Sequence, residues 1–412
     1  MKPDREVPNR GNLRAADAST LDRVRAIGPG IRTHGIGWLG RRLLNLLSEP
    51  GRLPGRLWRF VWVLLYVGLL GSAAAVICLV NPRKRVTVFY DLKVAPVTFD
   101  VCWALAAAEY LRLQRGFASV RLILVPGPVD GFREEDAEFE RIVDHDTRRR
   151  RLDAIHKQVA ALVPSLDDVV VCRSRCAATW RRIVDGCAVL PVSYWPALPR
   201  AMRPRYLLER KRAGDKIPLP FRAPPSAVEA VAAWIDALGP ERSLVVITLR
   251  QFSYTPVRNS NLDAWVAFAA ELDPDLYRVV FVPDTEVADG PADPRLADFP
   301  MMTAAAHDIA VRMALYERAY LNLMVNNGPH LLCLFNAHCR CLLFKVLTPG
   351  VPQTTPEYMR YLGFEVGQTP PLAPAHHRWI WEDDELPVIQ REFARMVGDI
   401  EAVNTVGSGP AN

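Results

Sequence analysis

Residues 319–346 read AYLNLMVNNGPHLLCLFNAHCRCLLFKV, and this stretch decides the class of fold. The apolar runs Ala319–Val325 and Cys341–Val346 each predict a buried strand. Between them, Pro329–Phe335 predicts a short helix whose first residue is a proline, which suits the first helical turn. A strand, a helix and a strand in succession favour a parallel sheet with helical crossovers.

The same alternation extends toward the N-terminus and predicts one α/β lobe over residues 226–400. Its earlier elements are expected to be a helix from Ser226, a strand at Leu244–Leu249, a helix at Leu262–Leu272, a strand at Arg278–Val282 and a helix at Ala304–Tyr316. Alternation this regular is typical of a doubly wound α/β fold. Residues 401–412 are predicted to form a flexible end.

A first α/β lobe is predicted over residues 86–225. Its expected elements are strands at Val86–Tyr90 and Val120–Val125 with a helix at Thr98–Arg115 between them, then strands at Val169–Cys172 and Ala188–Val192. The proline-rich and basic segment 199–225 is interpreted as a linker or exposed crossover between the lobes. The chain of 412 residues is thus long enough for two lobes and a further segment.

That further segment is Leu57–Val80, LWRFVWVLLYVGLLGSAAAVICLV, which we expect to be a single transmembrane helix. It is long enough to cross a hydrocarbon core of about 30 Å. Trp58, Trp62 and Tyr66 gather toward one end, as aromatic residues do at a membrane interface. A buried core helix of this length would normally show a polar face, which this sequence lacks.

Residues 1–56 are predicted to be a basic, largely flexible tail that supplies much of the net charge of +6. This distribution favours contact with solvent or lipid headgroups over nucleic acid. Counting basic residues on either side of the apolar segment favours a cytosolic N-terminus, which would export the large domain. We nevertheless expect a single-pass protein of the bacterial inner membrane with a cytosolic catalytic domain, and the orientation stays open.

The eight cysteines lie mostly in apolar runs, where reduced thiols behave as small hydrophobic groups. This pattern favours a reducing compartment. The spacings Cys172-Arg-Ser-Arg-Cys176 and Cys339-Arg-Cys341 differ from those of zinc ribbons, so we expect no metal site.

Three loops that follow predicted strands are polar, and ligands of open α/β sheets bind at that edge. They are Arg250–Trp265, Pro283–Glu286 and Asn326–His330. In the last loop, NNGPH, exposed N–H groups at a helix start would favour an anion such as a diphosphate. An ordinary turn with an asparagine cap explains the same letters.

In the first of these loops Arg250 and Arg258 are candidates to hold phosphate oxygens through paired hydrogen bonds. Alternatively, Arg258 is simply exposed and Asn259 belongs to a helix cap. Asp284 and Glu286 could accept hydrogen bonds from a ribose or chelate a metal, although a surface turn explains them as well.

The stretch Leu244–Val346 resembles the nucleotide-sugar-binding lobe of GT-B glycosyltransferases, in particular the heptosyltransferase and fucosyltransferase branches. The resemblance rests on the arginine-bearing loop after one strand and on NNGPHLL after a later one. It implies two Rossmann-like lobes and a donor site whose residues are those of the three loops. These are Arg250, Arg258, Asn259, Asp284, Glu286, Asn326, Asn327, Gly328, Pro329 and His330. Without a Glu-x7-Glu signature or an Asp-x-Asp pair, the resemblance implies an inverting, metal-independent reaction with no cofactor.

That chemistry needs a general base from the first lobe and cationic or N–H groups to stabilise the leaving nucleoside diphosphate. Asp91, directly after the first predicted strand, is the first candidate for the base, and Asp100 is the second. Each has a structural alternative, as a turn residue and as a carboxylate at a helix start. His307 and His330 are further acid or base candidates.

Three hypotheses follow. The first is a membrane-attached glycosyltransferase that moves a sugar from a nucleotide-sugar donor to a glycan or lipid-linked acceptor. The second is a sugar-nucleotide epimerase on the same scaffold, which would have little need of a membrane. The third is a non-catalytic glycosyltransferase-like subunit of an envelope assembly complex. The fold alone does not choose among them.

Overall fold

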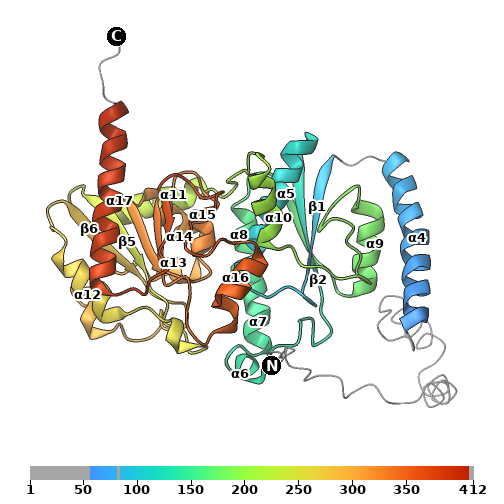
Figure 1. The fold of residues 1–412 in the computed structure, drawn as a ribbon, viewed down its shortest axis with the longest axis horizontal. Coiled ribbons are helices and arrows are strands. Elements are labelled where there is room, and N and C mark those ends of the chain that lie inside the picture. The colour runs from blue at the N-terminus through green and yellow to red at the C-terminus, as the bar shows by residue number, and fades with distance from the viewer. Residues whose placement is uncertain (1–55, 81–83, 408–412) are drawn as a thin grey trace, which may run out of the picture.

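The computed structural model describes residues 56–80 and 84–407. It contains two parallel sheets with helices packed around them (Figure 1). The expected α/β class with parallel sheets is therefore confirmed. The predicted basic tail lies outside the described residues except for Arg56.

The first sheet has the strand order β3-β2-β1-β4. Its strands are β1 (Arg85–Asp91), β2 (Ser119–Val125), β3 (Leu166–Val171) and β4 (Ala188–Leu190). The helices of this lobe are α5 (Val101–Arg115), α6 (Ala137–Ile142), α7 (His145–Arg151), α8 (Gln158–Ala161), α9 (Arg175–Asp185) and α10 (Pro204–Arg212). The side chains of Val86 to Asp91 are all buried, as expected for a parallel strand covered on both faces.

The second sheet has the order β6-β5-β7-β8-β9. Its strands are β5 (Ser243–Thr248), β6 (Tyr277–Val282), β7 (Leu321–Val325), β8 (Cys341–Phe344) and β9 (His377–Trp379). Its helices are α11 (Pro225–Asp236), α12 (Leu262–Glu271), α13 (Ala304–His307), α14 (Ile309–Arg318), α15 (His330–Leu334), α16 (Pro356–Leu362) and α17 (Leu386–Gly407).

The structure differs from the predicted elements in several places. The proposed linker contains helix α10, and the expected helix 304–316 is divided at Asp308, which caps α14 through the N–H groups of Ala310 and Val311. Strand β8 ends at Phe344, because Lys345 adopts a positive φ of 54°. Helix α17 continues past residue 401, where a flexible end was expected.

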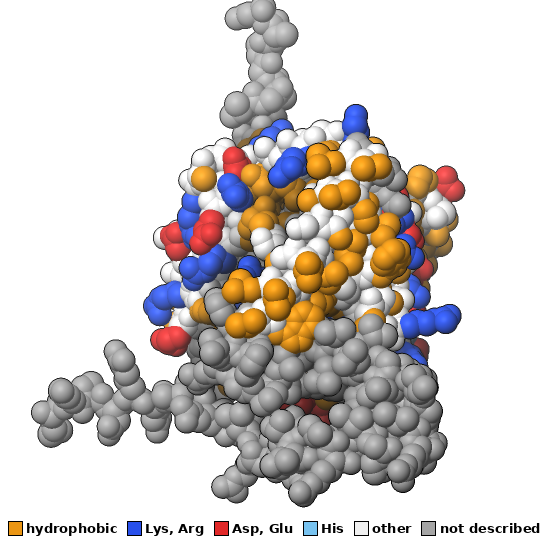
Figure 2. Space-filling model, turned by 90° about the vertical axis from the view of Figure 1, so that its right-hand side faces the viewer, with side chains coloured by type: hydrophobic (Ala, Val, Ile, Leu, Met, Phe, Trp, Pro, Cys, Tyr) orange, Lys and Arg blue, Asp and Glu red, His pale blue; other side chains and the backbone are white. Residues whose placement is uncertain are grey.

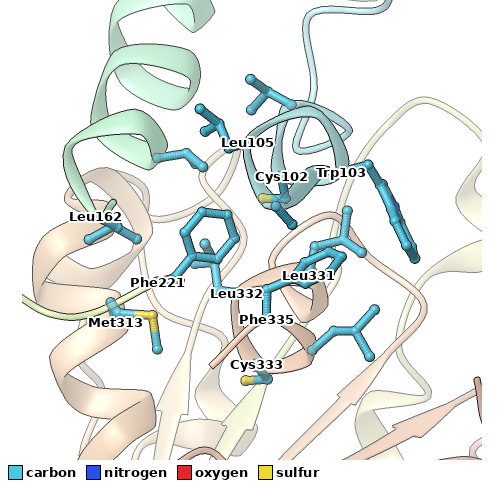
Figure 3. Close-up of a cluster of buried hydrophobic side chains, with 14 of the residues drawn as sticks. Cys102, Trp103, Leu105, Leu162, Phe221, Met313, Leu331, Leu332, Cys333 and Phe335 are labelled. Atoms are coloured by element: carbon cyan, nitrogen blue, oxygen red, sulfur yellow. The ribbon is translucent and has the colours of Figure 1, made fainter. Parts of the chain in front are cut away.

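The two lobes share one hydrophobic core. Helix α5 is rich in alanine, and ten consecutive residues, Val101–Tyr110, are buried. In Figure 3, Trp103 and Leu105 of this helix lie beside Phe335, Leu331 and Leu332 from the segment around α15. The rings of Trp103 and Phe335 are 4.9 Å apart at right angles, a favourable aromatic arrangement. This packing holds the lobes together.

Helix α4 (Arg56–Val80) lies on the side of the first lobe that faces away from the second lobe (Figure 1). Residues 61–80 have a mean hydropathy of 2.5, and the helix is long and apolar enough to cross a membrane by length and composition. One side of α4 packs against α9 and the segment near Trp195. A disulfide joins Cys78 of α4 to Cys187, so these two cysteines depart from the expectation of reduced thiols, while Cys102, Cys172, Cys333, Cys339 and Cys341 are free.

Candidate functional site at the lobe junction

Loops that follow strands of both sheets meet at one place, which we call the lobe junction. The Tyr254 hydroxyl, in the loop after β5, donates to Asp136, in the segment after β2, at 3.1 Å. The guanidinium of Arg151, at the end of α7, lies 5.4 Å from the centre of the Phe252 ring. The carboxyl edges of the two sheets are therefore brought together, as required for a ligand shared by both lobes.

The loop after β7 lies tightly against the first lobe at the junction. A side chain at Gly328 would place its Cβ 2.5 Å from the ring of Phe99 in the first lobe, so only glycine fits without movement. Asp100 is the next residue, directly before α5. On the other side, the guanidinium of Arg258 donates to the carbonyl oxygen of Asn326 at 2.9 Å. Arg258 thus contacts the loop after β7 at Asn326, and the same loop packs at Gly328 against Phe99, the residue before Asp100.

Arg250 is buried and organises the loop that carries it. Its guanidinium donates to the carbonyl oxygens of Tyr254 (2.8 Å) and Thr255 (3.2 Å) and to the side-chain oxygen of Asn259. Burial, together with the nearby charge of Arg258, lowers the pKa of Arg250 to about 10. Arg250 therefore holds the loop in shape and contributes positive charge that the carbonyl groups do not neutralise.

Arg258 and Arg151 bring two further cations to the junction. Burial lowers the pKa of each guanidinium below its ordinary value. The Nε atom of Arg258 is buried and has no hydrogen-bond partner among the described residues. An arginine in this condition is a suitable donor for an anionic ligand, because a buried N–H without an acceptor is costly.

The acidic residues after β6 hold backbone groups of the same loop. Asp284 accepts hydrogen bonds from the N–H of Gln251 at 3.2 Å and of Glu286 at 3.3 Å. Glu286 accepts one from the N–H of Ser253 at 2.7 Å. Both carboxylates also act on Arg151 and Arg250 by charge, which favours the protonated guanidinium groups. The observed contacts of Asp284 and Glu286 therefore stabilise the conformation of the loop after β5.

The NNGPH segment is less suited to anion binding than its sequence indicates. Helix α15 has only five residues and begins at His330, so its dipole is small. The N–H of His330 already donates to the side chain of Asn327 at 3.3 Å, and the side chain of Asn326 donates to the carbonyl oxygen of Val346 at 2.9 Å. The arginines must therefore supply most of the attraction for a phosphate.

His330 is buried beside the arginines. Burial is the main cause that lowers its pKa to about 4, and the charge of Arg258 lowers it further, so the ring is neutral near pH 7. Its Nδ1 faces the carbonyl oxygen of Asn327, which requires a proton on Nδ1 and leaves Nε2 as the acceptor of the ring. His307, the other candidate, is partly exposed and lies 3.0 Å from Asp289.

The first candidate for the base, Asp91, is fully buried and paired. It accepts two hydrogen bonds from Arg175 at 2.8 Å, one from Tyr194 at 2.6 Å and one from the N–H of Lys93 at 3.0 Å. A carboxylate with these four hydrogen bonds is already fully engaged by the protein and has no exposed surface. This environment suits a structural ion pair better than a general base.

Asp100 has the environment that a base requires. Its surface is exposed, yet the protein packed around it raises the pKa of its carboxyl above the ordinary value, against the opposing effects of the Thr98 hydroxyl and the charge of Arg133. Its side chain makes no capping hydrogen bond to α5. Its charge also acts on Tyr358 of α16, in the second lobe. Asp100 therefore lies at the junction and is accessible.

Several junction residues were not predicted from the sequence. Arg151 is the last of four consecutive arginines, and only the position of α7 shows which of them faces the second lobe. Lys345 follows β8 and donates to the carbonyl oxygen of Asn259 at 3.3 Å. Lys345 was predicted to lie inside the strand Cys341–Val346. The only sequence feature that indicated its role was its charge at the end of the apolar run Cys341–Phe344.

No group of three or more histidine, cysteine or acidic side chains suited to a metal ion occurs among the residues that the structure describes.

Neither a protein-family model nor a curated protein sequence matches this chain. Similar solved structures are glycosyltransferases. One is a glycosyl transferase of family 9 from Veillonella parvula, with 10% identity and a TM-score of 0.42 over 63% of this chain and 80% of that one. Another is the ADP-heptose lipopolysaccharide heptosyltransferase II of E. coli, with 10% identity and a TM-score of 0.43 over 76% and 99%.

A third is the wall teichoic acid polymerase TagF, with 9% identity and a TM-score of 0.26 over 80% of this chain and 87% of that one. Identities and TM-scores this low do not assign a function to this chain, so a function has to be inferred from the residues of the junction.

Proposed function

We propose that this protein is a glycosyltransferase that uses a nucleotide-sugar donor. The observation that carries the proposal is the set of three arginines, Arg151, Arg250 and Arg258, at the carboxyl edge of the second sheet, connected through Gly328 and Phe99 to the exposed Asp100. Cations on one side and a carboxylate on the other are what glycosyl transfer from a diphosphate needs.

In the proposed reaction, the diphosphate of the donor binds at the arginines. Asp100 takes the proton from the acceptor hydroxyl while the oxygen of that hydroxyl attacks the anomeric carbon. The bond between this carbon and the diphosphate oxygen breaks, and the electron pair leaves with the diphosphate, whose growing charge Arg258 and Arg151 stabilise. A single displacement of this kind inverts the anomeric configuration.

Asp284 and Glu286 support the arginine loop in this proposal. Asn259 and Asn326 hold it against its neighbours, and Asn327 holds His330. His330 keeps a neutral acceptor nitrogen next to Arg258 for a sugar or ribose hydroxyl. Gly328 and Pro329 allow the close approach of the lobes. No metal or cofactor takes part.

We also propose that α4 attaches the enzyme to a membrane, near a glycan or lipid-linked acceptor. A cytosolic domain at the bacterial inner membrane is the arrangement that gives access to free nucleotide sugars. The Cys78–Cys187 disulfide is of a kind found in oxidising compartments and argues for the other side. Protease accessibility of the large domain in intact spheroplasts distinguishes the two.

The test of the donor site is thermal stabilisation of the full chain in detergent by a panel of nucleoside diphosphates and nucleotide sugars. A ligand that binds the folded state raises its stability by mass action. We expect a clear rise with one nucleotide, and its loss in Arg258→Gln. The matched control is Arg318→Gln, an arginine that pairs with Glu241 at the opposite edge of the sheet.

A rise that survives Arg258→Gln would place the nucleotide elsewhere. The absence of a rise with every nucleotide would contradict the proposal and favour a non-catalytic envelope subunit.

A further inference from the structure

Helix α4 has two different faces, although its sequence is apolar all round. The inner face packs on the first lobe along most of the helix. The Tyr66 hydroxyl hydrogen-bonds with the Thr179 hydroxyl of α9 at 2.8 Å, and the rings of Tyr66 and Trp195 are 5.9 Å apart. Ala74 is buried in the same contact, and Cys78 is bonded to Cys187 further along.

This lateral contact conflicts with a spanning position for α4. A helix that crosses a bilayer is surrounded by lipid or by other apolar surface over its whole length. The inner face of α4 is instead covered by a lobe that carries charges close to the contact. The guanidinium of Arg182 lies 4.4 Å from the centre of the Trp195 ring, the same ring that Tyr66 touches. Asp185, at the end of α9, is paired with Arg85 and Arg121. Such groups are costly within hydrocarbon.

The outer face of α4 is exposed and apolar. Its exposed large side chains range from 36% to 83% in relative exposure and are Val61, Leu64, Leu65, Leu69, Val76, Leu79 and Val80. Trp180 of α9 is 63% exposed and follows Thr179, the residue that holds Tyr66. Figure 2 shows the hydrophobic side chains gathered across this face, with lysines and arginines on both sides of them.

We propose that α4 lies along the surface of a lipid bilayer while it stays docked on the first lobe. Its outer face then enters the boundary between headgroups and acyl chains, and the lobe takes the place of the polar face that an interfacial helix normally carries itself. An apolar patch of this size on one face marks an interaction site.

A bilayer with anionic headgroups fits better than a protein partner as the occupant. The patch is bordered by lysines and arginines (Figure 2), and the chain before α4 is rich in arginine. Trp180 of α9 is exposed beside the contact with α4, and aromatic residues of this type are enriched at membrane interfaces. The inference concerns attachment alone and does not depend on the proposed transferase.

The first experiment is flotation of the full chain with vesicles of phosphatidylethanolamine and phosphatidylglycerol, and with vesicles of phosphatidylcholine alone. We expect partition into both, stronger with the anionic lipid. Leu65→Asp with Leu69→Asp should lower partition at least tenfold. The matched control is Val228→Asp with Leu276→Asp, two exposed apolar residues of the second lobe, which should leave partition unchanged.

If the outer-face variant keeps its partition, α4 is not the attachment surface and the proposal is wrong. The unmodified chain could instead form a dimer in the absence of lipid that the outer-face variant does not form. The outer face would then bind a second copy of the chain, and the proposal would also be wrong.

The second experiment distinguishes lying from spanning. A nitroxide label is placed at Leu64, Leu69, Val76 or Leu79, all on the outer face, and its depth in the vesicle is measured by relaxation with oxygen and with a water-soluble nickel complex. A docked, lying helix predicts four similar shallow depths. A spanning helix predicts a deep centre and shallow ends on opposite sides, which would overturn the proposal.

Ala74→Phe sharpens this measurement. A ring at position 74 overfills the contact with the lobe and, once the Cys78–Cys187 disulfide is reduced in both proteins, should release α4. We expect the depth profile of this variant to change toward that of a spanning helix. A profile identical to that of the unmodified chain would mean that docking does not control the position of α4, against the proposal.

Discussion

Asp91 and Arg250 occupy comparable places in the two lobes and have opposite surroundings. Asp91 is the last residue of β1, and Arg250 follows β5 by two residues. Both are buried. Asp91 is directly paired with Arg175. Arg250 is hydrogen-bonded to carbonyl oxygens and an amide, has a second arginine nearby, and is influenced by Asp284 and Glu286 without a direct ion pair to either. The charge of Asp91 is matched by Arg175, whereas the site around Arg250 keeps positive charge for a ligand.

The difference teaches that the position of a charged residue at a strand end does not define its role. A buried charge with a matched partner stabilises the fold and is unavailable for chemistry. A buried charge without such a partner is tolerated where a ligand supplies the missing charge. On this basis we propose that the second lobe binds the donor diphosphate and that the first lobe contributes its base from the more exposed Asp100.

The largest expected effect comes from breaking the pair of Asp91 and Arg175. Arg175→Met leaves Asp91 buried without its cation and should lower the free energy of unfolding by about 3–5 kcal/mol. Urea unfolding followed by tryptophan fluorescence measures it. Adding Asp91→Asn should recover part of the loss. Arg360→Met, which removes an exposed partner of Glu357, is the control and should cost less than about 1 kcal/mol.

If Arg175→Met were as stable as the unmodified chain while transfer was lost, Asp91 would have to be reconsidered as the base.

Asp100→Asn should have the second largest effect, and on activity alone. Loss of a general base lowers kcat on the order of 10²- to 10⁴-fold. Folding should not suffer, because the carboxyl makes no capping hydrogen bond to α5. Since the pKa of Asp100 is raised in the fold, its protonated form is favoured there, and its contribution to stability is lost as the pH rises through the folded pKa. The asparagine variant should therefore be at least as stable at pH 7.

Thr98→Val is a companion to that variant. It removes the hydroxyl that donates to Asp100 and should raise the pKa of the carboxyl further. The acidic limb of the pH profile of kcat should then move to higher pH while the activity at its plateau is kept. An unchanged profile would separate Asp100 from the chemistry.

Particular residues show how far the sequence predicts this molecule. The strands from Leu244 to Val325 were placed within a few residues, because parallel strands buried on both faces are continuous apolar runs. The end of β8 at Phe344 was missed, since neither the positive φ of Lys345 nor its contact with Asn259, far away in the sequence, leaves a signal in an apolar run. The docking of α4 on α9 likewise has no signature in an apolar sequence.

The candidate site shows the same division. The loop with Arg250 and Arg258 could be found because polar residues after a strand mark the ligand edge of an open sheet. The pairing of Asp91 with Arg175 joins residues 84 positions apart and could not be found. The same holds for Arg151, which only the packing of the lobes brings to the junction.

The donor site itself offers a smaller effect. Arg258→Gln should weaken binding of the nucleoside diphosphate about 10- to 100-fold, since a hydrogen bond to a charged group contributes about 1.5–3 kcal/mol. Isothermal titration measures this affinity. Arg258→Lys should restore part of it, because lysine keeps the charge and loses the paired geometry. Equal affinity in all three proteins would remove Arg258 from the site.

The smallest expected effect is the response of His330 to its neighbour. Burial keeps the pKa of His330 near 4, and the charge of Arg258 is a secondary cause. Arg258→Gln should therefore raise this pKa, measured by NMR of histidine labelled with ¹³C, while burial still holds it below the ordinary 6.5.

A histidine with a lowered pKa stabilises the fold above pH 6.5, and this contribution is lost as the pH falls toward the folded value. The variant should thus lose less stability than the unmodified chain between pH 6.5 and 4. If the pKa of His330 is the same in Arg258→Gln and in the unmodified chain, the arginine and the imidazole are not neighbours in solution. The second lobe would then lack the concentrated positive charge that distinguishes it from the first.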